Sequence, residues 1–380
     1  MSASTGDAGV FLAHATPGNV PPELTPIRLL TGWVFEPIPI LVAMLFGGLY
    51  LYGVHKLRAR GDTWSRWRSF SFLGLGLGSF LVATESALAA YDTVLLSVHM
   101  VQHMVLAMIT PIFLALGAPI TLALRTLPSK WRNRLNALLH SRYAKVVTFP
   151  AFAGFLFVLN PFALYFTPWY ELTLRNQFMH DFNHVHFVII GCMWFWPLLG
   201  LDPMPRASHP MRLLAVFATL PFHAWLGIAI MSSSTVIAGD WYEDLGRDWG
   251  ASPLSDQGTA GGILWGSGDI IGLLVFLVLF VQWARASERE AVREDRRLDR
   301  LELIEAGRLA REERLAREER LAREAAQASE AAGEEAGTPA RGPAKSLAKT
   351  TLAGDSSRTE DIGSPVRVAG VADSRPTDVE

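Results

Sequence analysis

Seven long apolar segments constrain the fold of this chain more than any other feature of its sequence. A helix that crosses the hydrocarbon core of a bilayer needs about 20 mostly apolar residues, because lipid leaves unpaired backbone polar groups unsatisfied. The sequence therefore predicts an all-α fold, a polytopic membrane bundle of seven transmembrane helices. These lie near residues 37–55, 70–91, 94–117, 146–166, 178–199, 211–232 and 261–283.

Basic residues are concentrated in alternate loops between these segments. They cluster at residues 55–68, 125–145, 206–212 and 285–289. The opposite loops, such as residues 91–93 and 240–256, are acidic or poor in positive charge. Because basic loops remain in the cytoplasm, the pattern predicts an N-terminus outside and a cytoplasmic C-terminus. Residues 1–36 are then an external N-terminal segment, and residues 37–283 form the membrane domain.

Charge is concentrated beyond the last apolar segment. The formal net charge is only −2, yet residues 284–380 hold 39 of the 70 charged side chains. Residues 284–327 are rich in Ala, Leu, Arg and Glu, with charge pairs three or four apart that predict a charged cytoplasmic helix. Residues 328–380 have the composition of a disordered tail. The near-neutral balance gives no electrostatic footprint for nucleic acid, so we expect no such partner.

Histidines are the main ionisable residues inside the predicted membrane helices, where ionisable groups are costly and mark functional sites. His99 and His103 are four residues apart, as are His180 and His184. This separation brings both imidazoles of a pair to one face of a helix. His223 stands alone in a later segment. The predicted topology places all five toward the outer side of the membrane, which predicts a shared metal site or proton relay.

The neighbours of these histidines favour copper among the metals. Imidazole suits copper, zinc and iron, whereas thioether sulfur favours Cu(I). Met231 lies two turns beyond His223, and other methionines adjoin the paired histidines. His186 lies on the other side of its helix from His184, so it reaches a shared site only through a local distortion. The competing interpretation is that these histidines and methionines only pack, as single ones in membrane helices usually do.

Five acidic residues are candidate charge partners of such a site. Asp92 either balances its charge or caps the following helix, and Asp181 is placed to fix the tautomer of a histidine. Asp269 either holds a neighbouring histidine, which we expect, or hydrogen-bonds across helices. The set comprises Glu85, Asp92, Asp181, Asp256 and Asp269.

No motif in the sequence indicates catalysis. There is no Gly-rich phosphate loop, no nucleophile elbow and no cysteine pair with metal-ligand spacing. The lone Cys192 excludes both a disulfide framework and a multi-cysteine metal site. We therefore expect that the protein is not an enzyme.

Several motifs together resemble the CtaG-type (caa3-type) family of cytochrome c oxidase assembly factors, over roughly residues 35–285. The charged tail lies outside this resemblance. The motifs are His99-Met100-Val101-Gln102-His103, Leu116-Gly117-Ala118-Pro119, His180-Asp181-Phe182-Asn183-His184-Val185-His186, Trp196-Pro197-Leu198-Leu199-Gly200-Leu201-Asp202-Pro203, Pro221-Phe222-His223-Ala224 and Asp256-Gln257 with Trp265-Gly266 and Asp269.

The resemblance implies a multi-pass protein of the bacterial plasma membrane that helps to assemble a haem–copper oxidase. It implies that the protein aids copper, with Cu(I) favoured, in reaching subunit I, and that its partners are that subunit and a copper donor protein. The copper would be passed by ligand exchange without turnover of a substrate. The expected ligands are His99, His103, His184 and His223, with His180, His186 and Met231 as alternates.

Three other functions remain open. The chain is alternatively a membrane b-type cytochrome, in which histidines from different helices ligate haem. It is alternatively a transporter of protons or metal ions that uses the same histidines as a relay. In the third alternative the histidines only pack, and the protein is a structural scaffold for the oxidase.

Overall fold

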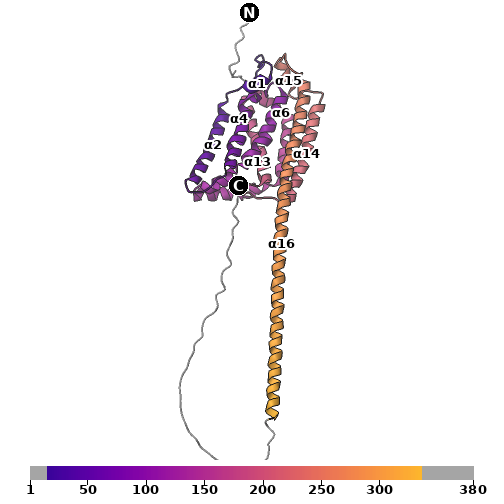
Figure 1. Cartoon of the computed structure of the whole chain (residues 1–380). Helices are drawn as coiled ribbons and strands as arrows, with labels where there is room; N and C mark the ends of the chain where they lie inside the picture. The colour runs from indigo at the N-terminus through magenta and orange to yellow at the C-terminus, as the bar shows by residue number, and fades with distance from the viewer. Residues whose placement is uncertain (1–14, 336–380) are drawn as a thin grey trace, which may run out of the picture. The chain divides into compact units, whose positions relative to one another are not determined.

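The computed structural model describes residues 15–335, and this part of the chain is helical with no β-strand (Figure 1). The predicted all-α class is confirmed. The first fourteen residues of the predicted external segment, and residues 336–380 of the predicted disordered tail, lie outside the described residues. The elements are α1 Pro26–Thr31, α2 Pro37–Arg58, α3 Arg66–Ser69, the π-helix η1 Phe70–Leu77, α4 Gly78–Glu85, α5 Ala87–Tyr91, α6 Leu96–Met104, the π-helix η2 Val105–Ile109, α7 Thr110–Leu116, α8 Pro119–Thr126, α9 Ser129–Leu139, α10 Arg142–Val147, α11 Pro150–Tyr165, α12 Trp169–Arg175, α13 Gln177–Leu199, α14 His209–Ser232, α15 Gly239–Asp244 and α16 Pro253–Glu335.

Within residues 15–335, five helical stretches are long and apolar enough to cross a bilayer. A sixth is formed if α11 and α12, which meet at an angle of 65°, count as one span. The chain is therefore a multi-pass membrane protein, and the number seven stays a prediction. The five stretches are Pro37–Arg58, Leu96–Thr126, Gln177–Leu199, His209–Ser232 and Pro253–Ala331.

The predicted span at residues 70–91 is interrupted near one end. The helical stretch of α3, η1 and α4 ends at Glu85, and Ser86 adopts an extended conformation with φ −92° and ψ −171°. The Ser86 side chain then caps α5 by accepting a hydrogen bond from the backbone N–H of Leu88 at 3.2 Å. The freed carbonyl of Glu85 accepts from the N–H of Val34 at 2.8 Å, which ties the segment before α2 to this break.

The basic loops meet at one end of the bundle. Asp62 pairs with Arg125 at 3.5 Å, and Asp202 accepts hydrogen bonds from Thr121. A single pocket joins Lys145 to the loop before α14. We call this the basic end, formed by residues 58–66, 118–148 and 200–208. Its composition agrees with the predicted cytoplasmic orientation, which itself stays a prediction.

The opposite end is closed by α1, α15 and the starts of α6 and α13. In Figure 1, α1 and α15 lie together at this end. The indole N–H of Trp241 in α15 donates to the carbonyl of Thr93 at 2.8 Å. Asp256, near the start of α16, accepts from the backbone N–H of Ser97 at 3.1 Å and so caps α6. We call this the closed end.

The chain divides into two compact units, residues 1–298 and 299–380. α16 continues without interruption past residue 283, and its last residue, Glu335, lies beyond the boundary predicted at 327. Within the second unit the leucines of the six-residue repeat are half exposed, at 50–55% for Leu309, Leu315 and Leu321. This exposure agrees with a solvated charged helix, and the few Arg–Glu pairs on it are surface pairs of small energetic weight.

Two helix contacts depend on the absence of a side chain. A Cβ added at Gly191 in α13 would overlap the carbonyl oxygen of Ala107 and would lie 2.5 Å from Cγ of Pro111. Gly227 in α14 and Gly261 in α16 face each other in the same way, each blocked by the other's carbonyl at 2.5–2.6 Å. Small residues of this kind allow the backbones of membrane helices to pack closely.

We expect Gly191→Ala to destabilise the protein by about 1–3 kcal/mol, because the new methyl group overlaps backbone atoms that have little freedom to move. Gly48→Ala in α2 is the control, since a Cβ there meets nothing within 4 Å. Thermal unfolding in detergent measures the midpoints of both variants relative to the wild type. An unchanged midpoint for Gly191→Ala would contradict the close approach of α13 to η2.

Candidate metal centre

Asp92, His180 and His184 meet near the closed end of the bundle. Asp92 follows α5 directly, and the two histidines lie in the first turns of α13. The Asn176 side chain starts that helix by accepting from the N–H of Met179 at 3.1 Å. Oδ2 of Asp92 lies 3.1 Å from Nε2 of His180 and 3.5 Å from Nε2 of His184. All three side chains are buried, so the bundle holds a carboxylate and two imidazoles away from solvent.

Gln102 joins this cluster from α6. Its Nε2 donates to Oδ2 of Asp92 at 2.8 Å and to the carbonyl of Ala83 at 3.0 Å. Its Oε1 lies 3.2 Å from Nε2 of His184. The side chain is completely buried, and its two bonds fix the amide so that the oxygen faces the histidine. Gln102 thus holds Asp92 and His184 in place relative to each other.

The spacing of the donor atoms fits a metal ion. Candidate ligand atoms of Asp92, His180 and His184 all lie within 4.8 Å of one another. Two ligands about 2.1 Å from a tetrahedral ion are about 3.4 Å apart, which is close to the separations observed here. Two imidazoles and one carboxylate suit copper, zinc or iron. The described residues contain no other group of three such donors.

Two further carboxylates lie close to the cluster. Oε2 of Glu85 accepts from the backbone N–H of Glu36 at 2.9 Å, and both side chains are buried. Gln177, at the start of α13, donates to Oε1 of Glu36 at 3.5 Å. The charge of Glu36 acts on His184. Glu36 and Glu85 therefore belong to the polar network around the cluster.

His99 and His103 extend from this cluster into the bundle. His99 is buried, and among the described residues neither of its ring nitrogens has a hydrogen-bond partner. Its electrostatic neighbours include Asp92, His180 and His184. His103 lies one turn further along, with Nδ1 3.3 Å from the hydroxyl of Tyr165, and His99 and His223 are among its electrostatic neighbours. The buried histidines thus form a series from the cluster into the bundle.

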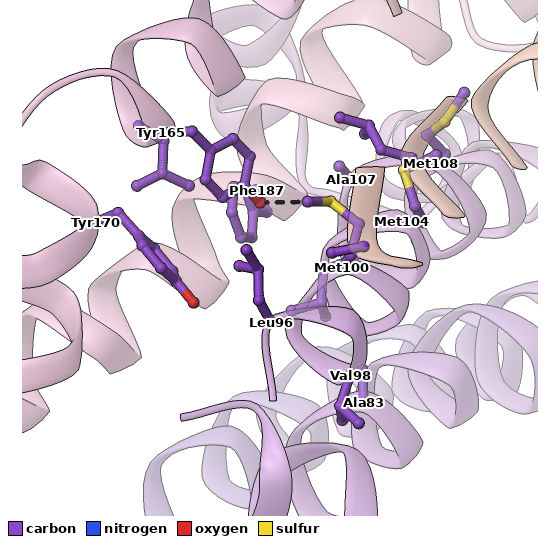
Figure 2. Close-up of a cluster of buried hydrophobic side chains, with 14 of the residues drawn as sticks. Ala83, Leu96, Val98, Met100, Met104, Ala107, Met108, Tyr165, Tyr170 and Phe187 are labelled. Carbon is purple, nitrogen blue, oxygen red and sulfur yellow. Dashed lines mark hydrogen bonds between the residues drawn. The ribbon is translucent and has the colours of Figure 1, made fainter. Parts of the chain in front are cut away.

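Aromatic rings and methionines enclose this series. Figure 2 shows the hydroxyl of Tyr165 facing Met100, whose sulfur accepts a hydrogen bond from it at 3.7 Å. The ring of His99 lies 4.8 Å from that of Tyr170. Tyr170 shares a hydrogen bond of 2.8 Å with Tyr242 of α15, and burial raises the pKa of Tyr242, so that phenol stays protonated. The surroundings are apolar except for the phenols.

Three of the predicted ligands have their described contacts away from the cluster. Nε2 of His186 lies 2.6 Å from Oδ1 of Asn160 in α11, on a different face of α13. Met231 is 43% exposed and packs against Gly261 and Gly262 of α16. The expectation that Met231 supplies a thioether to the same site is therefore not supported by its position. His223, although buried, packs against Phe157 and the backbone at Gly268.

The acidic partners also differ from expectation. Asp181 accepts from Gln177 at 2.9 Å, one turn back on its own helix, because it points about 100° around the helix from His180. The position beside the histidines belongs to Asp92 instead. Asp269 accepts from the indole N–H of Trp265 at 2.9 Å, so its described hydrogen bond is not to a histidine. Asp256 caps α6, as described above.

The sequence interpretation missed Gln102 and Glu36. Gln102 stands between His99 and His103, three residues after the first, and a buried amide in an apolar segment was the available signal. Glu36 immediately precedes Pro37 and fell in the segment assigned to the exterior. The break at Ser86 and the entry to α2 bring that carboxylate into the bundle.

Comparison with known proteins gives a family and curated relatives. The family described as cytochrome c oxidase caa3 assembly factor matches residues 48–286. Uncharacterized proteins of Mycobacterium bovis and Mycobacterium tuberculosis are 36% identical over 298 residues, and one of Mycobacterium leprae is 35% identical over 301 residues. Each match covers 76% of this chain and 44% of the relative, so the chain spans less than half the length of these relatives. No solved structure matches it.

Proposed function

Because the chain belongs to the cytochrome c oxidase caa3 assembly factor family, we propose that it receives copper at the Asp92–His180–His184 cluster and aids its delivery to subunit I of a haem–copper oxidase. The observation that carries this proposal is the buried set of two imidazoles and a carboxylate with metal-like spacing. Copper is here a cargo that leaves by ligand exchange, so the role is not catalytic.

The donor set bears on which form of copper binds. Imidazole binds both oxidation states, whereas a carboxylate favours Cu(II) and a thioether favours Cu(I). Met231 is half exposed, whereas Met100 and Met104, which adjoin His99 and His103 in the chain, are buried thioethers. We propose that the cluster binds Cu(I) through Asp92, His180 and His184, with His99 as an additional ligand.

The location of the cluster suits delivery toward the outer side of a bacterial plasma membrane. The cluster lies near the closed end, opposite the basic loops. If the basic end is cytoplasmic, as the charge pattern predicts, the cluster faces the outer leaflet. An oxidase subunit and a copper donor protein are the partners that this arrangement implies.

The test combines metal content with oxidase assembly. The purified full chain is loaded separately with Cu(I), Cu(II) and Zn(II), and bound metal is counted for the wild type and for His180→Ala/His184→Ala. We expect loss of the bound copper in the double variant and, in a deletion strain, an oxidase deficient in copper. His186→Ala on the same helix is the control. Full oxidase assembly by a variant that binds no copper would favour the scaffold function.

One observation favours a second function, the transport of protons or metal ions. The buried histidines form a series that continues from the cluster to His103 and His223. Such a series is the arrangement expected of a relay. Flux in liposomes that His103→Ala abolishes would identify a transporter, whereas copper retention without flux would support the assembly function. A Soret absorption band in the purified protein would instead identify a b-type cytochrome.

A further inference from the structure

An apolar groove runs between α11 and α14 on the outside of the bundle. It has a volume of about 530 Å³. It is lined by small residues, including Ala151, Gly154, Ala215 and Ala218, and by larger apolar side chains. At its far end the rings of Phe162 and Trp225 approach to 5.2 Å and close it. The groove is thus a slot of defined length in the membrane-facing surface.

The length of the groove matches one leaflet. Its lining extends from Pro150 to Phe162 along α11, a rise of about 18 Å at 1.5 Å per residue. Half of a hydrocarbon core of about 30 Å is about 15 Å. One extended acyl chain therefore fits along the groove from the membrane surface to its closed far end.

The open end of the groove continues into a polar pocket at the basic end. This second pocket has a volume of about 340 Å³ and shares Pro150 and Met211 with the groove. Lys145 and Arg206 line it, together with Ser208, the residue that precedes α14. Because Ser208 makes no side-chain cap, the positive end of the α14 dipole remains available here. The pocket therefore offers two cations and a helix N-terminus to an anion.

A buried cation lies beside this pocket. Arg212 is 4% exposed, and its Nε has no hydrogen-bond partner among the described residues. Its guanidinium and that of Arg206 both lie against Gly200. None of the described ion pairs involves Lys145, Arg206 or Arg212. The described hydrogen bonds of Arg206 and Arg212 go to the backbone carbonyls of Asp202 and Leu198.

We propose that this groove and pocket bind an anionic phospholipid, with an acyl chain along α11 and α14 and the phosphate between Lys145 and Arg206. The charge selects an anionic headgroup, since basic pockets between membrane helices on the cytoplasmic side bind such lipids. A transmembrane helix of a partner would fill the groove but leave the adjoining cations without an anion. The proposal does not depend on the copper function, because the groove opens at the end of the bundle opposite the cluster.

Native mass spectrometry of the full chain tests the proposal. The protein in detergent is given equal amounts of phosphatidylglycerol and phosphatidylcholine with the same acyl chains. Each basic group near a membrane surface contributes roughly a five-fold preference for anionic lipid, so we expect about a 25-fold preference from two. Lys145→Ala/Arg206→Ala should reduce the preference nearly to one. Lys130→Ala/Arg132→Ala removes the same charge from the neighbouring α9, outside the pocket. This variant should retain the preference for phosphatidylglycerol.

A second variant tests the groove itself. Ala218→Trp fills the slot and should lower retention of both lipids, whereas Ile228→Trp, on an exposed part of α14 outside the groove, should not. Equal retention of both lipids by the wild type, or displacement of phosphatidylglycerol by inorganic phosphate, would overturn the proposal. So would an Ala218→Trp variant that retains lipid but no longer co-purifies with oxidase subunit I, because the groove would then hold a partner helix.

Discussion

Asp92→Asn is expected to weaken copper binding by at least about 100-fold while leaving the fold intact. Residues that only orient a ligand already contribute 10- to 100-fold to metal affinity, and Asp92 lies within 3.5 Å of both cluster histidines. Asparagine keeps the size of the side chain but removes its negative charge and half of its acceptor capacity. Equilibrium dialysis of the purified variant against buffered Cu(I) and Cu(II) measures the loss.

The stability of the metal-free protein should move in the opposite direction. A buried carboxylate carries a large desolvation penalty, which the neutral amide avoids. We therefore expect the unfolding midpoint of metal-free Asp92→Asn to equal or exceed that of the wild type, and the stabilisation by added copper to be lost. If the Asp92 carboxylate lowers the stability of the metal-free protein, its charge is retained for function and not for folding.

Asp181→Asn provides the matched control. It makes the same chemical change on α13, one residue from His180, at a carboxylate whose described partner is Gln177. Copper affinity should then change by less than about two-fold, because an exposed charge acts weakly through solvent. If both variants lose copper equally, the effect is one of general charge and the cluster is not the binding site.

The sequence predicted the helices and the histidine faces well, because both follow from local periodicity. His180 and His184 share a face as their spacing of four requires, and the rings lie 4.4 Å apart. His186 lies off that face, as its spacing of two from His184 also predicts. The closeness of Asp92 to these rings depends on how the segment that follows α5 lies beside α13, which no local pattern encodes.

The parts that the sequence did not predict depend on contacts between distant segments. Met231 lies in an apolar helix near histidines in the predicted topology, yet the structure places it, half exposed, against Gly261 of α16. Asp269 instead pairs locally with Trp265, four residues earlier on the same helix. Close approaches at Gly227 and Gly261 set how α14 packs against α16. Hydropathy identifies an apolar helix but does not say which of its faces meets which neighbour.

Asp202→Ala is expected to destabilise the protein by about 3–5 kcal/mol. Oδ1 of Asp202 accepts from the backbone N–H and the hydroxyl of Thr121, at 2.7 and 2.5 Å. Oδ2 accepts from the indole N–H of Trp196 at 2.8 Å and from the N–H of Ile120 at 3.3 Å. Asp202 thus caps α8, whose own N-cap residue, Ala118, has no side chain that can do so. Alanine would leave these donors unpaired next to the basic end.

Graded variants separate the cap from a general loss of charge. Asp202→Asn keeps one carbonyl oxygen, so it should satisfy one of the two sets of donors and lose about half as much stability. Asp62→Ala removes a carboxylate from a half-exposed pair with Arg125 and should cost less than about 1 kcal/mol. Thermal unfolding in detergent should order the three midpoints accordingly, with Asp202→Ala lowest by roughly 10 °C. Equal midpoints for Asp202→Ala and Asp62→Ala would show that charge at the basic end matters and the cap does not. If the predicted order holds, Asp202 joins Trp196 of α13 to the start of α8 and fixes the end of the helix that carries the cluster histidines.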